Sequence, residues 1–175
     1  MDQFNLRAEI LKTHSKVQCN KIIAWVGNDQ KRFDELFNLF LQPEYLLAQR
    51  AAWPLSYCAL AHPGFIKKRL GELIKNLHKR VIHDSVKRNT LRILQEIDIP
   101  KKYQGEVMNI CFQYVESPVE AVAIKAFSLG ILGKMAKLYP DILPEIKLLI
   151  EAQLPNQTAA FAGRAKRLLK ANAGL

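Results

Sequence analysis

Apolar residues fall on one helix face in segment after segment of this chain. They recur at i, i+3, i+4 and i+7, the spacing that gathers side chains along one side of an α-helix. Three such stripes are Ile66, Leu70, Leu73, Ile74 and Leu77; Val107, Ile110, Cys111, Tyr114 and Val115; and Ile142, Ile146, Leu149 and Ile150. No stretch alternates with period two for long enough to predict a strand. The pattern therefore predicts an all-α protein.

Prolines punctuate the predicted helices. Pro43, Pro63, Pro118 and Pro140 precede or open apolar stripes, where the first helical turn tolerates a missing N–H. Pro54 falls inside a helical pattern instead, and we expect it to kink that helix.

One helix pattern recurs at a nearly fixed interval. Its reference copy is Val86, Thr90, Ile93, Leu94 and Ile97. The matching sets are Ala48, Ala52, Leu55, Ser56 and Ala59; Ile124, Ser128, Ile131, Leu132 and Met135; and Phe161, Ala165, Leu168 and Leu169. The second position is always small, which lets a neighbouring helix approach closely. The interval of about 38 residues predicts a repeat architecture.

A second amphipathic helix is predicted between consecutive copies, near 63–78, 103–116 and 141–153. The unit is thus a helical hairpin, which buries its apolar faces only by stacking on its neighbours. We place the repeats at 44–172. The segments "KIIAWVG" and "FDELFNLFL" predict one more helix pair within 1–42, which we interpret as an atypical N-terminal capping repeat.

Two of the recurring segments carry a family resemblance. "SVKRNTLRILQEIDIP" and "AIKAFSLGILGKMAKLYP" resemble the first helices of HEAT repeats, of the HEAT/armadillo-type superhelical family. There, an apolar residue followed by a cation, a small residue and an L-x-x-L-like run opens each unit. The matching positions are Val86–Lys87, Thr90 and Leu94–Ile97, then Ile124–Lys125, Ser128 and Leu132–Met135, and Pro54 fits the proline kink of such helices. The resemblance implies a right-handed α-α superhelix of about four to five hairpins.

Composition supports one soluble domain over residues 1–175. Apolar residues make up 49% and charged residues 24% of the chain, and no Pro/Gly/Ser-rich linker divides it. The N-terminus lacks the pattern of a signal peptide, and no segment approaches the ~20 apolar residues that span a bilayer. We therefore expect a cytoplasmic protein with no membrane partner. Cys19, Cys58 and Cys111 are odd in number and far apart, which predicts three reduced core thiols.

The positive charge is concentrated. Residues 67–102 hold eleven cations against four acids, a local net charge of +7 within a chain of net +10. From Ala152 to the end there are four cations and no acidic side chain. Such a field attracts polyanions or an acidic protein surface.

The predicted helix 63–78 supplies the leading contact residues. Lys68, Lys75 and Lys79 recur on the face opposite its apolar stripe, and the family resemblance implies that second helices line the concave, partner-binding side. The full set of candidate partner- or phosphate-binding residues is Lys67, Lys68, Lys75, Lys79, Arg80, Arg88 and Arg92. Arg88 also matches Arg50 in the repeat, which suggests that both bond to a neighbouring helix end.

Catalytic and metal-binding patterns are weak. His14, His62, His78 and His83 form no i, i+4 ligand pair, and we interpret them as isolated surface or helix-end residues. Paired acids such as Asp34–Glu35 and Glu96–Asp98 are interpreted as solvated helix faces or ends. No phosphate-binding glycine loop, His-Glu-x-x-His or Gly-x-Ser-x-Gly is present. We predict no cofactor, no metal and no small-molecule substrate.

The tryptophans raise one enzymatic alternative. Some HEAT-like proteins are DNA glycosylases that hold damaged duplex with tryptophans and an acid, and Trp25, Trp53 and Asp98 fit that description superficially. Core packing explains both tryptophans better. Gly130 and Gly133 lie within a helical pattern and are predicted to permit close packing.

The sequence thus favours a non-enzymatic binding scaffold that engages an acidic protein partner through a basic surface. The first alternative is sequence-independent, salt-sensitive binding of nucleic acid through phosphate contacts. The second is a HEAT-like DNA glycosylase.

Overall fold

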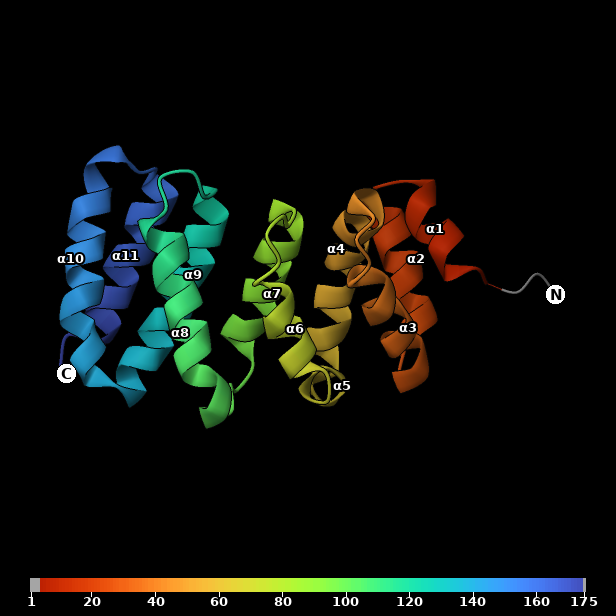
Figure 1. Ribbon diagram of the computed structural model, residues 1–175, viewed down its shortest axis with the longest axis horizontal. Helices are drawn as coiled ribbons and strands as arrows, with labels where there is room; N and C mark the ends of the chain where they lie inside the picture. The colour runs from red at the N-terminus through yellow and green to blue at the C-terminus, as the bar shows by residue number, and fades with distance from the viewer. Residues whose placement is uncertain (1–3, 175) are drawn as a thin grey trace. The chain divides into compact units, whose positions relative to one another are not determined.

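The computed structural model describes residues 4–174, except for the side chain of Asn156. Regular structure in this range is entirely helical (Figure 1), as the sequence predicts. The elements are, in chain order, α1 (Leu6–Lys12), α2 (Lys16–Val26), α3 (Gln30–Phe40), α4 (Tyr45–Ala61), α5 (Pro63–Lys67), α6 (Leu70–Asn76), α7 (Asp84–Glu96), α8 (Lys101–Glu116), α9 (Val122–Leu138), the short 3-10 helix η1 (Pro140–Ile142), α10 (Leu143–Gln153), η2 (Leu154–Asn156) and α11 (Ala159–Ala171). In this part of the chain, no helix combines the length and apolar character needed to cross a membrane.

The N-terminal segment holds three helices rather than the predicted pair. Its described part contains α1 in addition to α2 and α3, which carry the two apolar segments seen in the sequence. Helix α1 ends at Lys12, and a new helix begins at Lys16 because Ser15 caps α2. The Ser15 hydroxyl accepts a hydrogen bond from the Gln18 N–H at 3.2 Å. Asp29 caps α3 in the same way, accepting from the N–H groups of Lys31 and Arg32.

The predicted repeat pattern is confirmed. The four copies lie on α4, α7, α9 and α11, with α5–α6, α8 and α10 between them. The small second position of each copy is buried, with exposed fractions of 0% for Ala52, Thr90 and Ser128 and 2% for Ala165. Pro54 lies inside α4, which continues through it to Ala61.

The chain forms two compact units, residues 1–93 and 94–175, whose boundary falls inside α7. In the N-terminal unit, α1, α2 and α3 each pack against α4 (Figure 1). In the C-terminal unit, α9 packs against both α8 and α11. The single domain over 1–175 and the right-handed superhelix stay predictions.

Phenylalanines dominate the core of the N-terminal unit. Phe33, Phe37 and Phe40 on α3 are at most 1% exposed, and Leu47 and Leu55 on α4 are fully buried. The Phe37 ring lies 6.3 Å from that of Phe33 and 6.0 Å from that of Phe40, between ring centroids. Such aromatic packing supplies a large buried area, so α3 and α4 form the central pair of this unit.

Glycines allow close contacts in the C-terminal unit. A Cβ atom on Gly133 would lie 2.9 Å from Cγ of Leu168, and one on Gly130 would lie 2.4 Å from Oε1 of Gln95. The contact with Leu168, a buried side chain, confirms the predicted role of Gly133. The Gln95 side chain near Gly130 is half-exposed and can move aside, so the role of Gly130 stays a prediction. The three cysteines are buried and free, also as predicted, and burial raises the pKa of Cys58 to about 12.

The predicted continuous helix 63–78 is wrong. The chain forms α5 and α6 with a break at Lys68 and Arg69, where Arg69 has φ −111° and ψ 8°, outside the helical range. The side chain of Arg69 reaches α3, donating to Oδ1 of Asn38 at 2.8 Å and lying 3.4 Å from Oδ1 of Asp34. These contacts between α3 and Arg69 accompany the break in the helix. The spacing of apolar residues could not predict them, because it depends only on local sequence.

Side chains tie helix ends to the following repeat. Arg50 donates to the Leu11 carbonyl at 2.6 Å, and Lys79 donates to the Leu41 carbonyl at 2.9 Å. In the C-terminal unit, Lys134 donates to the Gln95 carbonyl at 2.5 Å. The partners are 38 or 39 residues apart, close to the repeat length, and each acceptor belongs to the end of a helix. A cation there satisfies a carbonyl left unpaired by the helix and complements its dipole.

Candidate functional site

The seven cations predicted as contacts come from several elements of the N-terminal unit. Lys67 ends α5, Lys68 lies in the break, and Lys75 lies in the last turn of α6. Lys79 and Arg80 follow α6, and Arg88 and Arg92 lie on α7. Because the helix breaks before Leu70 and ends at Asn76, the prediction that Lys68, Lys75 and Lys79 share one helix face is wrong.

Five of these cations remain available for a partner. Lys67, Lys68, Lys75, Arg80 and Arg88 are exposed, and none of them forms an ion pair with a described residue. No described carboxylate therefore lies within ion-pair distance of these cations. An exposed and unpaired cation adds to the field that attracts acidic ligands.

The other two cations have contacts within the protein. Lys79 is exposed, but its ammonium donates to the Leu41 carbonyl at the end of α3. The guanidinium of Arg92 lies 4.5 Å from the centroid of the Tyr57 ring, and this neighbour lowers the pKa of the Tyr57 hydroxyl. Lys79 keeps two of its three N–H donors for another ligand, whereas Arg92 is held against α4.

Arg69 is one of the eleven cations of residues 67–102, and its contacts lie within the protein. It donates to the Glu72 carboxylate at 2.5 and 3.0 Å, and its guanidinium lies 4.4 Å from the Phe37 ring centroid. The bond to Glu72 raises the pKa of Arg69, and Arg69 in turn lowers that of Glu72. The i, i+3 spacing of Arg69 and Glu72 was a readable signal for this pair.

The predicted shared role of Arg50 and Arg88 is half correct. Arg50 bonds to the end of α1 through the Leu11 carbonyl, as expected. Arg88 is exposed and has no such bond among the described residues, so the equivalence is wrong for Arg88. The repeat position leaves Arg88 free to contact a partner.

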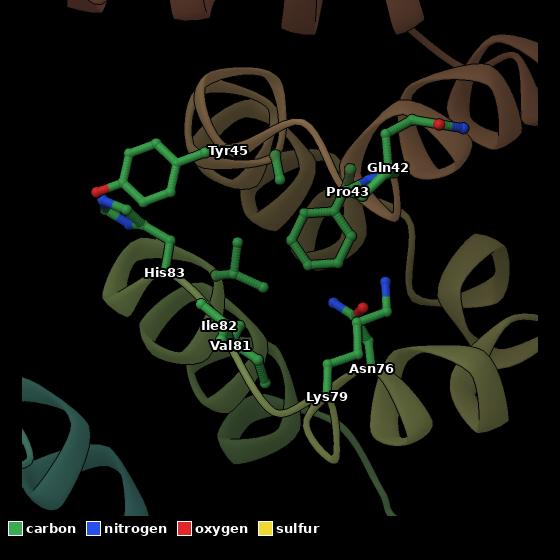
Figure 2. A pocket seen from close by; sticks show the side chains of 11 residues that line it. Gln42, Pro43, Tyr45, Asn76, Lys79, Val81, Ile82 and His83 are labelled. Atoms are coloured by element: carbon green, nitrogen blue, oxygen red, sulfur yellow. The ribbon is translucent and has the colours of Figure 1, made fainter.

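A pocket of about 370 Å³ lies beside Lys79 in the N-terminal unit (Figure 2). Its wall is formed by the end of α3, the start of α4, the end of α6, the loop after it and the start of α7. Phe40 and Val86 are buried parts of the lining, whereas Val81 at the rim is 85% exposed. Sequence reasoning missed this pocket because its residues are spread from 40 to 86.

One polar side chain in the pocket lacks a complete set of partners. Asn76 is only 5% exposed, and its Oδ1 is buried without a hydrogen-bond partner. Figure 2 shows its amide directed into the pocket near Lys79. A buried amide oxygen without a partner is costly, and a bound ligand that donates a hydrogen bond to it removes that cost.

His83 lies at the opposite rim of the same pocket. Its Nδ1 accepts a hydrogen bond from the Ser85 N–H at 2.9 Å, so His83 caps the start of α7 through its side chain. Its ring lies edge-on to that of Tyr45, with centroids 4.5 Å apart. Burial lowers the pKa of His83, and Arg88 lowers it further while Asp84 raises it.

This cap predicts a pH-dependent contribution to stability. Only the neutral ring accepts from Ser85, and the folded pKa lies below the ordinary value of about 6.5. The unfolded chain therefore binds the proton more readily, and the contribution, complete above about pH 6.5, is lost as the pH falls through the folded pKa. We expect wild type to lose stability relative to His83→Asn below about pH 6.5, because asparagine caps without titrating.

Urea denaturation of both proteins at a series of pH values measures this difference. Titration of the other groups is common to both proteins and cancels in the comparison. Parallel stability curves across this range would show that the His83 cap contributes nothing.

His14, His62 and the two tryptophans have local packing contacts. His62 stacks on Phe65 with ring centroids 4.9 Å apart, and Trp53 lies 5.6 Å from the ring of His14. Trp25 stacks on Phe4 at 4.8 Å. Both tryptophans are half-buried, so the predicted core packing holds for only part of each ring.

Histidine, cysteine and acidic side chains are the usual protein ligands of metal ions. Over residues 4–174, no group of three or more of them lies close enough together to hold a metal ion. Asp98, named with the tryptophans in the glycosylase alternative, lines a separate pocket in the C-terminal unit beside Lys134.

Comparison with known proteins bears on the family. A family model described as a HEAT repeat domain matches residues 6–172, so the match includes α1 to α3 as well as the predicted repeats. No curated protein and no solved structure matched significantly. Helical-repeat scaffolds of this kind mediate protein interactions and are generally not enzymes. Since the match covers nearly the whole chain and the regular structure of the described residues is entirely helical, the protein belongs to the HEAT repeat family.

Proposed function

We propose that this chain is a non-enzymatic scaffold that binds an acidic protein partner through the cations of α5 to α7. The observation that carries the proposal is the set of five exposed cations without ion pairs in the N-terminal unit. Charge of this kind steers an acidic surface and raises its association rate. The cytoplasm is the compartment we propose, in keeping with three buried free thiols.

Charge reversal tests the proposal. A random-peptide phage library is panned on immobilised wild type, and enriched peptides are synthesised with a fluorescent label and titrated by anisotropy. We expect enriched peptides to be acidic, and Lys68→Glu/Lys75→Glu/Arg80→Glu to weaken their binding by about tenfold or more. Raising the salt concentration is expected to weaken wild-type binding as well.

The matched control reverses three exposed lysines elsewhere in the same unit. Lys12→Glu/Lys16→Glu/Lys31→Glu changes the net charge equally and is expected to retain most of the binding. Labelled duplex and single-stranded DNA and RNA are titrated in parallel. Tight nucleic-acid binding with no acidic peptide enriched would contradict the proposal and favour phosphate recognition.

A further inference from the structure

The pocket beside Lys79 combines an apolar lining with unused hydrogen-bonding groups. Phe40 and Val86 form buried parts of its wall, Ile82 is half-buried, and Val81 and Tyr45 at the rim are 85% and 62% exposed. A volume of about 370 Å³ falls within the roughly 300–1,000 Å³ range of ligand-binding pockets. Exposed apolar side chains around such a pocket are typical of a binding site.

The amide of Asn76 restricts which ligand fits. Its Oδ1 is a hydrogen-bond acceptor that is buried without a partner, so it favours a ligand that carries an N–H donor. A peptide backbone supplies an N–H, which is the donor that this oxygen lacks. A nucleic-acid phosphate supplies acceptors alone and brings no apolar group to the lining. The pocket therefore favours a peptide over a phosphate.

The charges next to the pocket define the rest of the ligand. Lys79 lines it and has N–H donors beyond the one given to Leu41, and Arg80 is exposed next in the chain. Both favour a carboxylate on the peptide close to the residue that enters the pocket. Aliphatic and aromatic lining favours a side chain about the size of leucine.

From this combination, we propose that the pocket between α3, α4, α6 and α7 anchors a short acidic segment of another protein by one leucine-sized apolar side chain. The side chain of the anchor fills the apolar pocket, a backbone N–H of the peptide donates to Oδ1 of Asn76, and neighbouring carboxylates contact Lys79 and Arg80. This assignment rests on the proposed function, because it specifies how the acidic partner is held.

A peptide library with one variable position tests the assignment. The library has a single fully randomised position flanked on both sides by aspartate or glutamate, and it is panned on wild type and on variants of the full chain. We expect leucine, isoleucine, methionine or phenylalanine to be enriched at that position on wild type. A synthetic peptide carrying leucine is expected to bind at least about tenfold more tightly than its alanine twin, since three buried carbons are lost.

Pocket variants and a matched control locate the binding. Ala48→Phe fills the pocket from α4 and is expected to abolish the preference for leucine over alanine. Ala24→Phe places the same ring at an exposed position of α2 and is expected to leave the preference for leucine over alanine unchanged. Because Ala48→Phe could disturb folding, Val81→Asp serves as a second variant at a rim position that is 85% exposed. In methyl NMR spectra, the leucine peptide is expected to change the chemical shifts of the methyl groups of Val81, Ile82 and Val86.

The possible results separate the two proposals. Acidic peptides that bind wild type with no preference at the variable position would overturn the pocket assignment and leave the proposed function standing. An unchanged leucine preference in both Ala48→Phe and Val81→Asp would do the same. If no acidic peptide is retained at all, both proposals fail, whether or not nucleic acid or a second copy of the chain binds.

Discussion

Phe37→Ala is expected to lower the free energy of unfolding of the N-terminal unit by about 3–5 kcal/mol. Phe37 is fully buried, with Phe33 and Phe40 on either side of it along α3. Truncation removes the transfer free energy of the ring and leaves a cavity between side chains that are themselves fixed by packing. It also removes the aromatic face under the Arg69 guanidinium, 4.4 Å away.

Tryptophan fluorescence during urea denaturation measures this effect in the relevant unit. Trp25 and Trp53 are the only tryptophans of the chain, and both belong to the N-terminal unit. Tyr57→Ala is the control, since Tyr57 is 43% exposed and its loss should cost less than about 1 kcal/mol. A loss below about 1 kcal/mol for Phe37→Ala would contradict the packing described for α3.

At Thr90, two substitutions are expected to change stability in opposite directions. Thr90→Leu should destabilise the protein by about 1–3 kcal/mol, because the position is fully buried and is small in every copy of the repeat. Thr90→Val should stabilise it by about 1 kcal/mol. The Oγ1 atom of Thr90 is buried without a hydrogen-bond partner, and valine replaces it with a methyl group of similar size.

Both variants are measured by the same fluorescence experiment, because Thr90 lies in the part of α7 that belongs to the N-terminal unit. The pair also provides its own control for the effect of β-branching, since threonine and valine share it. Unchanged stability in Thr90→Leu would show that the position is not a site of close helix approach. Destabilisation in Thr90→Val would show that the hydroxyl is hydrogen-bonded.

Much of the helical architecture was predictable because it depends on local spacing. The pattern around Thr90 recurs on α4, α9 and α11, and a helix places those apolar positions on one face wherever they occur. The small second position and the close contact at Gly133 on α9 were predictable for the same reason. The break at Arg69 could not be predicted, because the apolar stripe of 63–78 continues through it. The break is accompanied by contacts of the Arg69 side chain with Asp34 and Asn38 on α3.

The candidate site was predictable only as a concentration of charge. Sequence spacing identified the cations from Lys67 to Arg92, but it could not assign their contacts within the protein. Lys79 meets a carbonyl 38 residues earlier, and Arg69 is neutralised by carboxylates on two segments. Such pairing depends on which helix ends come within about 3 Å in the folded chain, and a charge pattern carries no such distance.

By itself, the sequence determined that the chain is all-helical, with a repeat of about 38 residues. It also determined the small close-contact positions and the excess of positive charge. Each of these follows from residue type and local periodicity. Tertiary structure alone decided which cations are free and where the pocket lies. The wall of that pocket combines Phe40, Asn76 and Val86 from separate helices. Their proximity, and the Asn76 oxygen left without a partner, arise from packing between helices that lie far apart in the chain.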